Sequence, residues 1–184
     1  MRLALASASP RRRDLLAAAG IGAEIAPQDV DESLVPNETP MAYVLRVARA
    51  KAAAYGGSCE AVLAADTTVA IDGLSLAKSE DDADAKRMLR VLAGRAHVVH
   101  TAVVLRTPAG TMERVVSTEV RFRALSDAEI ERYVVSGEHK DKAGAYGIQG
   151  KGGALVDAVD GSYTNIVGLP LEETLAMLRA AGVL

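Results

Sequence analysis

The chain has 184 residues, of which 49% are hydrophobic and 24% are charged. This composition is typical of a globular domain large enough to bury a core, and it excludes an intrinsically disordered chain. A formal net charge of -3 argues against a generally basic protein that binds nucleic acid polymers, so any polyphosphate must be held by local clusters of positive charge. We predict a single domain spanning residues 1–184.

Metal-binding and targeting signals are weak. The lone Cys59 allows no intrachain disulfide and no cysteine-based zinc site. His97, His100 and His139 lack metal-ligand spacing, and we interpret them as structural or surface residues. The N-terminus has too short an apolar run for a signal peptide, and no run approaches the roughly 18 apolar residues of a membrane span. We therefore expect a cytoplasmic protein with no membrane partner.

The N-terminal stretch combines a strand signal with a helix start. The apolar run 3–6 predicts a buried strand, and Ser9-Pro10 predicts a helix that ends at Gly20. Arginines 11–13 occupy its first turn, at the positive end of the helix dipole. The free backbone N–H groups of the first turn and the paired N–H donors of the arginine guanidinium groups would suit a phosphate. The alternative is a solvated basic turn.

A polar loop follows a short expected strand over 21–26. The loop carries three carboxylates, Asp29, Asp31 and Glu32. Such a cluster would suit a cation. Without a partner carboxylate elsewhere, the loop by itself favours an acidic surface segment.

The next helix places a lysine among apolar residues. Thr39-Pro40 predicts its start, and the helix should run to about Tyr55. Lys51 lies seven residues after Val44 and therefore shares the apolar face. Two interpretations stay open at this point: the side chain extends past the edge of the core, or its ammonium group reaches an internal anion.

The run 61–71 is the clearest central strand. It is apolar except for Asp66 and two threonines, and a buried carboxylate requires a partner. Asp66 is therefore the best candidate for metal binding or base chemistry; the alternative is an aspartate that caps a turn at the end of a shorter strand. A turn at Asp72-Gly73 should lead into a returning strand over 74–79, with Lys78 near its end.

The second half of the chain alternates helix and strand signals, which favours a compact α/β or α+β fold. A capping box formed by Ser79 and Asp82 predicts a helix to about Leu92, and Ser126 with Glu129 predicts another to about Ser136. The further expected elements are a long hairpin over 97–106 and 111–123, and a helix from Pro170 to Gly182.

A glycine-rich segment lies between these elements. Five glycines fall in the ten residues from Gly144, so the backbone there turns sharply or approaches something closely. The spacing fits neither a phosphate-binding P-loop nor a dinucleotide fingerprint. Gln149 is its best group for reading a base, since an amide both donates and accepts. The alternative, a plain surface loop, is weakened because Tyr146 and Ile148 favour burial.

Several of these motifs together resemble the Maf family of nucleoside triphosphate pyrophosphatases. The resemblance spans nearly the whole chain, with the motifs in the family's order. The matching segments are Ser7 to Arg12, Ala65 to Thr67, Gly94 to His97 with Thr101, Asp141 to Gly150, and Val167 to Leu171. Ala145 to Gln149 resembles the branch that cleaves dTTP and UTP rather than the branch that acts on 7-methyl-GTP.

The resemblance implies a fold and a reaction. The fold would be mixed α/β and two-lobed, similar in shape to inosine triphosphatases, with a central mixed sheet and an active-site cleft. The reaction would convert a nucleoside triphosphate to a monophosphate and pyrophosphate, using Mg²⁺ or Mn²⁺. Proteins of this family are often homodimers, so we expect a homodimer here.

The resemblance also assigns roles to residues. It implies that Asp66 is the proton acceptor. Substrate discrimination falls on Arg11, Thr67 and Gln149, and phosphate and metal contacts fall on Ser7, Arg12, Glu32, Lys51 and Lys78. Glu32 and Asp66 would hold the metal. Ser79 departs from the family, which usually has proline there, and Thr68 replaces a commoner apolar residue.

Three functions remain to be weighed. The first is hydrolysis of dTTP and UTP, and the second is house-cleaning of modified pyrimidine nucleotides, which differs only in the base pocket. The third is a non-catalytic nucleotide-binding regulator of cell division and septum formation. A pure binder has no need of Glu32 and Asp66, so the sequence favours an enzyme.

Overall fold

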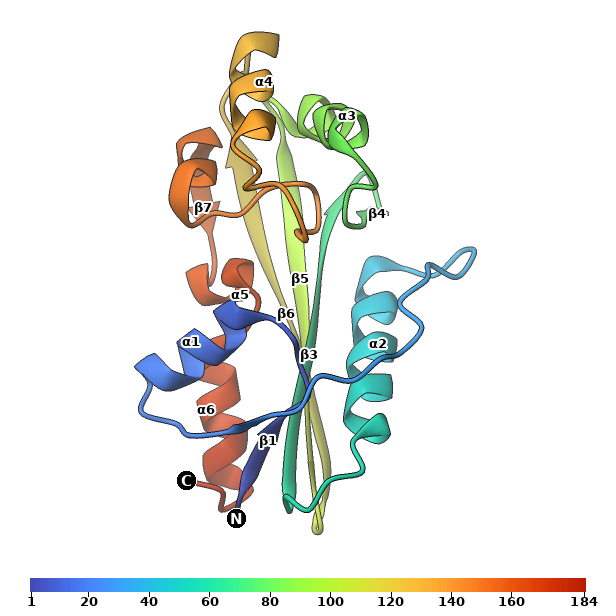
Figure 1. Cartoon of the computed structure of the whole chain (residues 1–184), viewed down its shortest axis with the longest axis vertical. Helices are drawn as coiled ribbons and strands as arrows, with labels where there is room; N and C mark the ends of the chain where they lie inside the picture. The colour runs from blue at the N-terminus through green and yellow to red at the C-terminus, as the bar shows by residue number, and fades with distance from the viewer.

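The computed structural model describes all 184 residues, arranged around one mixed seven-stranded sheet that runs along the molecule (Figure 1). Its strand order is β2-β1-β3-β5-β6-β7, with β4 also paired to β3. The strands are β1 (Leu3–Leu5), β2 (Glu24–Ile25), β3 (Ala61–Ile71), β4 (Leu74–Leu76), β5 (Ala96–Thr107), β6 (Gly110–Phe122) and β7 (Val156–Asp160). The prediction of a mixed α/β fold with a central mixed sheet is confirmed.

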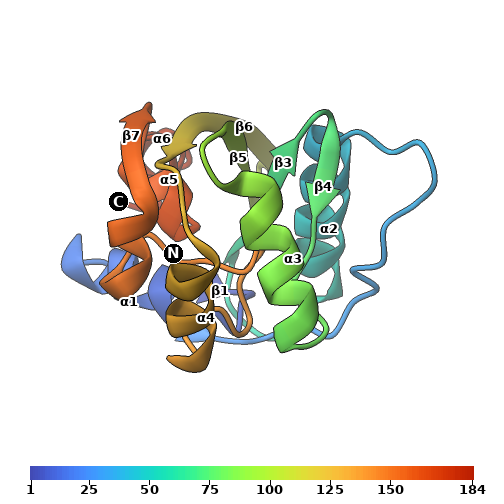
Figure 2. The same ribbon diagram turned by 90° about the horizontal axis from the view of Figure 1, so that it is seen from above.

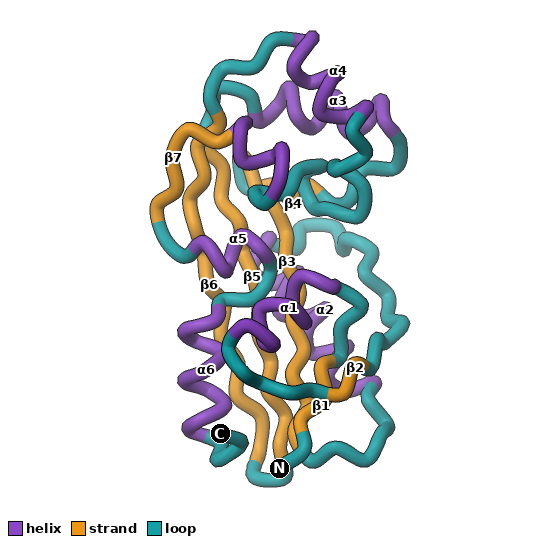
Figure 3. Tube along the Cα trace, turned by 60° about the vertical axis from the view of Figure 1, so that its left-hand side comes forward, coloured by secondary structure: helices purple, strands orange, loops and turns teal.

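The helices cover this sheet in two groups, visible as an upper and a lower half in Figure 3. The α-helices are α1 (Pro10–Ala18), α2 (Pro40–Ala54), α3 (Asp82–Leu92), α4 (Asp127–Val135), α5 (Tyr163–Val167) and α6 (Leu171–Ala180), and a 3₁₀ helix, η1, spans Gly150–Leu155. In the lower half, α2 lies on one face, while α1 and α6 lie on the other (Figure 1). Helices α3 and α4 lie at the upper end in Figure 1 and are neighbours in the view from above (Figure 2).

Three apolar clusters stabilise these layers. One cluster joins α3 and α4 to the upper parts of β3, β5 and β6. Another joins β1, β3 and β5 to α1 and α6, and the third packs α2 against the opposite face of the same strands. Alternate residues of β3 point to opposite faces, so Leu63 belongs to the α6 cluster and Ala64 to the α2 cluster.

Local signals account for most helix starts. The Thr39 hydroxyl accepts a hydrogen bond from Ala42 N at the start of α2, and proline follows at the first helical position. Ser126 and Glu129 form the predicted capping box of α4. Ser9 does precede α1, yet its side chain makes no capping hydrogen bond.

The structure corrects several boundaries. The capping box predicted at Ser79 is wrong, because Asp81 is the N-cap of α3 and accepts a hydrogen bond from Asp84 N. The strand expected over 21–26 shortens to β2, and the one expected over 74–79 shortens to β4. Strand β7 and helix α5 were not predicted; both are short, and pairing with β6 forms β7.

A gap in the sheet lies beside the middle of β3. Strand β5 pairs with one edge of β3 from Val62 to Ala70. On the other edge, β1 pairs with Ala61 to Leu63 and β4 pairs with Val69 to Ile71. Residues 64–68 therefore have no neighbouring strand on that edge, and the fold leaves space there for a site.

Candidate functional site

A cavity of about 650 Å³ lies at this gap and is lined by 27 residues from both halves of the molecule. Its walls come from the β1–α1 turn, the loop before α2, α2 itself, β3, the segment after β4, the glycine-rich loop and α5. The structure brings all nine sequence-derived candidates together in these walls. They are Ser7, Arg11, Arg12, Glu32, Lys51, Asp66, Thr67, Lys78 and Gln149.

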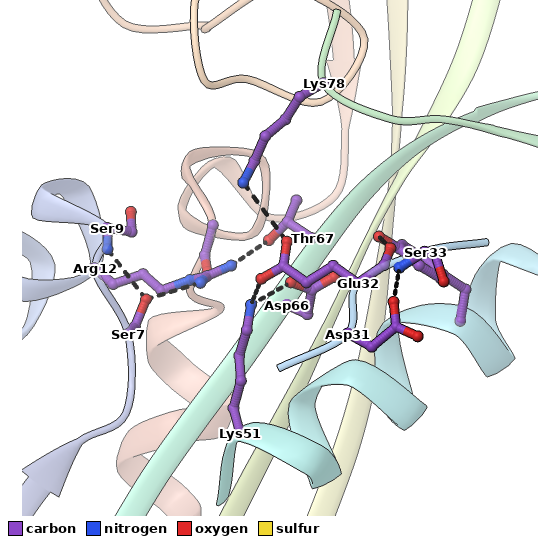
Figure 4. Close-up of polar contacts among 12 residues, drawn as sticks. Ser7, Ser9, Arg12, Asp31, Glu32, Ser33, Lys51, Asp66, Thr67 and Lys78 are labelled. Carbon is purple, nitrogen blue, oxygen red and sulfur yellow. Dashed lines mark hydrogen bonds and ion pairs between the residues drawn. The ribbon is translucent and has the colours of Figure 1, made fainter. Parts of the chain in front are cut away.

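The centre of the cavity holds an ammonium group between two carboxylates (Figure 4). Lys51 Nζ lies 2.8 Å from Asp66 Oδ1 and 2.7 Å from Glu32 Oε1. Lys51 and Asp66 are each 7% exposed, so this pair is buried. Lys78 Nζ approaches the other oxygen of Glu32 at 3.6 Å from the opposite side of the cavity.

These contacts decide between the alternatives that the sequence left open. Lys51 reaches an internal anion. Asp66 lies inside an eleven-residue strand and does not cap a turn. Of the three carboxylates in the acidic loop, only Glu32 lines the cavity. Asp31 instead accepts a hydrogen bond from Ser33 N at 2.8 Å, and Asp29 lies outside the cavity wall.

The pKa values of the two carboxylates are shifted in opposite directions. Burial raises the pKa of Asp66, and the nearby charges of Lys51 and Arg12 only partly offset this effect. Burial also raises the pKa of Glu32, but hydrogen bonding to Lys51 and the charges of Lys51 and Lys78 outweigh it, so the pKa of Glu32 is lowered. Asp66 therefore holds a proton more readily than an ordinary aspartate.

Arg12 is a buried, fixed cation on the other face of β3 (Figure 4). Its Nε donates to Gly168 O at 2.7 Å and its Nη1 to Ser7 Oγ at 3.0 Å. Its Nη2 donates to Thr67 Oγ1 at 3.1 Å. A guanidinium carries five N–H groups, so two remain for an anion that enters the cavity. Strand alternation thus places Asp66 toward Lys51 and Thr67 toward Arg12.

The cavity is positively charged although the whole chain carries a net charge of -3. Its cationic side chains are Arg11, Arg12, Lys51, Lys78 and Lys142, and its carboxylates are Glu32, Asp66 and Asp141. Sequence reasoning did not single out Lys142, whose Nζ donates to the carbonyls of Glu138 and Lys140. The only signal for it was its place in the segment that begins at Asp141.

The glycine-rich loop forms a second wall. Tyr146 is 5% exposed, and its hydroxyl lies 2.7 Å from His97 Nε2. The Tyr133 hydroxyl accepts a hydrogen bond from Gly147 N at 3.1 Å. Gln149 is exposed at the rim, and its side-chain amide makes no hydrogen bond within the protein. The loop is therefore anchored by buried tyrosines, which leaves its amide free for a ligand.

None of the three histidines lines the cavity. His97 bonds to Tyr146, His139 Nε2 lies 3.1 Å from Asp82 Oδ1, and His100 Nδ1 lies 2.7 Å from Ser117 Oγ. Their interpretation as structural or surface residues is confirmed. No group of three or more histidine, cysteine or carboxylate side chains could hold a metal by itself, and no helix is long and apolar enough to cross a membrane.

The excess of cationic side chains in this cavity, around the buried carboxylate–lysine pair, suits an anionic ligand. The family model described as "Maf-like protein" matches residues 2–181. The chain therefore belongs to the Maf family, as its motifs indicated.

Curated relatives that carry the name dTTP/UTP pyrophosphatase resemble the chain over nearly its whole length. A protein from Anaeromyxobacter dehalogenans is 56% identical over 98% of this chain and 94% of its own. One from Shewanella oneidensis is 50% identical over 100% of both chains. One from Chromobacterium violaceum is 48% identical over 98% of this chain and 95% of its own. Among solved structures, a HAM1 protein from Coxiella burnetii is 19% identical over 98% of this chain and 99% of its own, with a TM-score of 0.49.

Proposed function

We propose that this protein hydrolyses nucleoside triphosphates, with dTTP and UTP preferred, to a nucleoside monophosphate and pyrophosphate. Relatives that are 48% to 56% identical over nearly the full chain carry the name dTTP/UTP pyrophosphatase, which supports this substrate class. Modified pyrimidine nucleotides would enter the same pocket, so a house-cleaning role forms part of the proposal.

One observation carries the proposal: a carboxylate with a raised pKa lies beside two fixed cations in a cavity. Asp66 lies in the gap of β3, with Lys51 on one face and Arg12 on the other. A carboxylate whose pKa is raised is a stronger base toward water than an ordinary aspartate. We assign proton acceptance from the attacking water to Asp66, with attack at the α-phosphorus.

The cations stabilise the charge that develops on the leaving pyrophosphate. Arg12 is held by three internal hydrogen bonds, so it does not need to reorganise when the substrate binds. Lys51 and Lys78 approach from α2 and from the segment after β4, and the Arg11 side chain adds a further charge. Ser7 completes the phosphate contacts, while Thr67 and Gln149 read the base.

A divalent cation fits the donor set of this cavity. Glu32 and Asp66 contribute hard carboxylate oxygens on either side of a position that already attracts the Lys51 ammonium. Mg²⁺ is commonly held by one or two carboxylates together with substrate phosphate oxygens. We propose that these two residues hold Mg²⁺ or Mn²⁺, which when bound neutralises phosphate charge and acidifies water.

The alternative is a non-catalytic regulator of cell division that binds nucleotides. A regulator would need the cationic cavity but not the buried carboxylates within it, so the Asp66–Lys51–Glu32 arrangement favours the enzyme. The proposed substrate is made and used in the cytoplasm, which is therefore the location we propose. The homodimer predicted from the family resemblance stays a prediction, tested by measuring the molar mass in solution.

The proposal is tested by measuring pyrophosphate release from dTTP, UTP, CTP, the purine triphosphates and 7-methyl-GTP. Each reaction is run with Mg²⁺, with Mn²⁺ and with a chelator. We expect metal-dependent release that is fastest from dTTP and UTP. Fastest release from 7-methyl-GTP would overturn the assignment of the Gln149 loop, and binding without any release would favour the regulator.

A further inference from the structure

A chain of hydrogen bonds connects Thr67 to the interior of the protein. Thr67 Oγ1 lies 2.9 Å from Thr101 Oγ1, and Thr101 Oγ1 lies 3.0 Å from the backbone carbonyl oxygen of Asn165 in α5. Thr101 and Asn165 are both 0% exposed, so water cannot replace either partner. Thr101 does not line the cavity, although it belongs to one of the motifs that resemble the family.

The partners of these hydroxyls fix the direction of their protons. A carbonyl oxygen can only accept, so Thr101 must donate its single proton to Asn165 O. Thr67 must then donate its own proton to Thr101. The reverse arrangement would leave the lone pairs of two buried oxygens facing each other at 3.0 Å, which is unfavourable where the dielectric constant is low.

Arg12 uses part of the remaining capacity of Thr67. A hydroxyl has one proton and two acceptor positions, and Arg12 Nη2 donates into one of the latter at 3.1 Å. Thr67 therefore has one lone pair left and no proton to offer. A ligand atom that bonds to this hydroxyl must be a donor.

This restriction limits the part of the substrate that faces Thr67. Phosphoryl oxygens are mainly acceptors at neutral pH, so Thr67 suits a ribose hydroxyl or an N–H group of the base. Uracil and thymine both present an N3–H donor, whereas N3 of cytosine is an acceptor and its donor is the neighbouring N4 amino group. A pocket that holds N3 against Thr67 therefore distinguishes the two kinds of base. Apolar side chains suited to a base lie in the same cavity wall, including Val69, Val99 and Ile166.

We propose that Thr101 is a positioning residue that fixes the Thr67 hydroxyl as a hydrogen-bond acceptor, so that the pocket selects the N3–H of uracil and thymine and rejects cytosine. The proposal rests on the proposed function and adds to it the base atom that the protein recognises, N3. Thr101 does not contact the substrate, and its effect on specificity acts through Thr67.

The test compares kcat/KM for UTP and CTP in wild type and three variants. Thr101→Val removes both hydrogen bonds with little change of volume, and it frees the Thr67 proton to donate to cytosine N3. We expect the UTP-to-CTP ratio to fall about tenfold or more, which is the effect of one misdirected hydrogen bond in a buried site. Thr101→Ser keeps the hydroxyl, so its UTP-to-CTP ratio should stay close to that of the wild type.

Thr118→Val is the matched control. Thr118 is 1% exposed, and its hydroxyl accepts a hydrogen bond from the Asn165 side chain at 2.9 Å, but it makes no hydrogen bond to Thr67 or Thr101. It should lower stability without changing the ratio. An unchanged ratio in folded Thr101→Val, or an equal fall in Thr118→Val, would overturn the proposal while leaving the pyrophosphatase activity established.

A substrate probe covers the case in which Thr101→Val does not fold. N3-methyl-UTP lacks the donor, so the wild-type protein should cleave it at least about tenfold more slowly than UTP. Equal cleavage of the two would overturn the proposal. Absence of pyrophosphate release from any triphosphate would refute the proposed function instead, and calorimetric binding of UMP against CMP would still test the pocket.

Discussion

The Lys51 ammonium lies 2.8 Å from the Asp66 carboxylate in the interior of the protein, and the two side chains come from different layers of the fold. Lys51 projects from α2, and Asp66 projects from the part of β3 that has a neighbouring strand on one edge only. The same ammonium also contacts Glu32, which Lys78 approaches as well, so two lysines and two carboxylates form one cluster. This arrangement makes the site sensitive to the loss of any of its members.

Replacing Asp66 by asparagine should abolish turnover and leave nucleotide binding measurable. The amide has nearly the same shape but cannot accept a proton from water, so kcat should fall by at least about a hundredfold. Asp72→Asn is the control, since Asp72 lies just beyond the end of β3 and pairs with Arg95 on the surface. Near-normal turnover of Asp66→Asn would refute the assignment.

Replacing Lys51 by methionine should destabilise the fold, because it leaves buried Asp66 without its ammonium partner. Loss of one member of a buried ion pair costs about 3–5 kcal/mol. Lys78→Met is the control: Lys78 contacts Glu32 at 3.6 Å with its side chain 60% exposed, so its loss should cost less than about 1 kcal/mol. Urea unfolding measures both.

The double variant Lys51→Met, Asp66→Asn tests the coupling directly. Once the carboxylate is neutral, the missing ammonium matters less. The two changes together should therefore cost less than the sum of the single changes. Strict additivity would show that the buried pair contributes no coupling energy.

His97 should remain neutral to well below physiological pH, because burial lowers its pKa from 6.5 to about 4. The unfolded chain takes up a proton on this side chain near pH 6.5, whereas the folded protein does so only near pH 4. The resulting stability is therefore present above pH 6.5 and is lost as the pH falls toward 4, by roughly 3 kcal/mol.

The measurement is urea unfolding from pH 7 to pH 4, with NMR titration of the His97 ring. In His97→Gln the side chain does not titrate, so its stability should fall less steeply than that of wild type over this range. Parallel curves for the two proteins, or a His97 ring that titrates near pH 6.5, would contradict the prediction.

Gly152 should not tolerate a side chain. A Cβ at this position would lie 1.9 Å from Gly147 O, within the loop that presents Gln149. Gly152→Ala must therefore displace the loop backbone, and we expect kcat/KM for UTP to fall about tenfold or more, the scale of a small misplacement in a catalytic site. Gly22→Ala is the control, since a Cβ there meets nothing within 4 Å.

The amino-acid sequence by itself determined the elements whose signals are local. Proline and threonine at the start of α2, the capping box of α4 and the apolar run of β3 depend on neighbours a few residues away, so they could be recognised without the fold. Residue patterns indicated most of the nine candidate residues and the family motifs supplied the rest, and all nine line one cavity. The spacing of Lys51 showed that it faces inward but did not identify its partner.

Only the tertiary structure decided how these residues act together. Each feature of the site involves segments that are distant in the chain. The gap beside β3 lies between β1 and β4, Glu32 and Asp66 share one ammonium group, and Arg12 contacts Gly168. Strand β7 and helix α5 escaped prediction because both are short. Pairing with β6 forms β7, and α5, which has only a Ser162 cap as a local signal, is tied to β5 and β6 by hydrogen bonds from the Asn165 side chain. The direction of the Thr67 proton likewise depends on Asn165, because a hydroxyl takes its orientation from its partners in space and not from its neighbours in sequence.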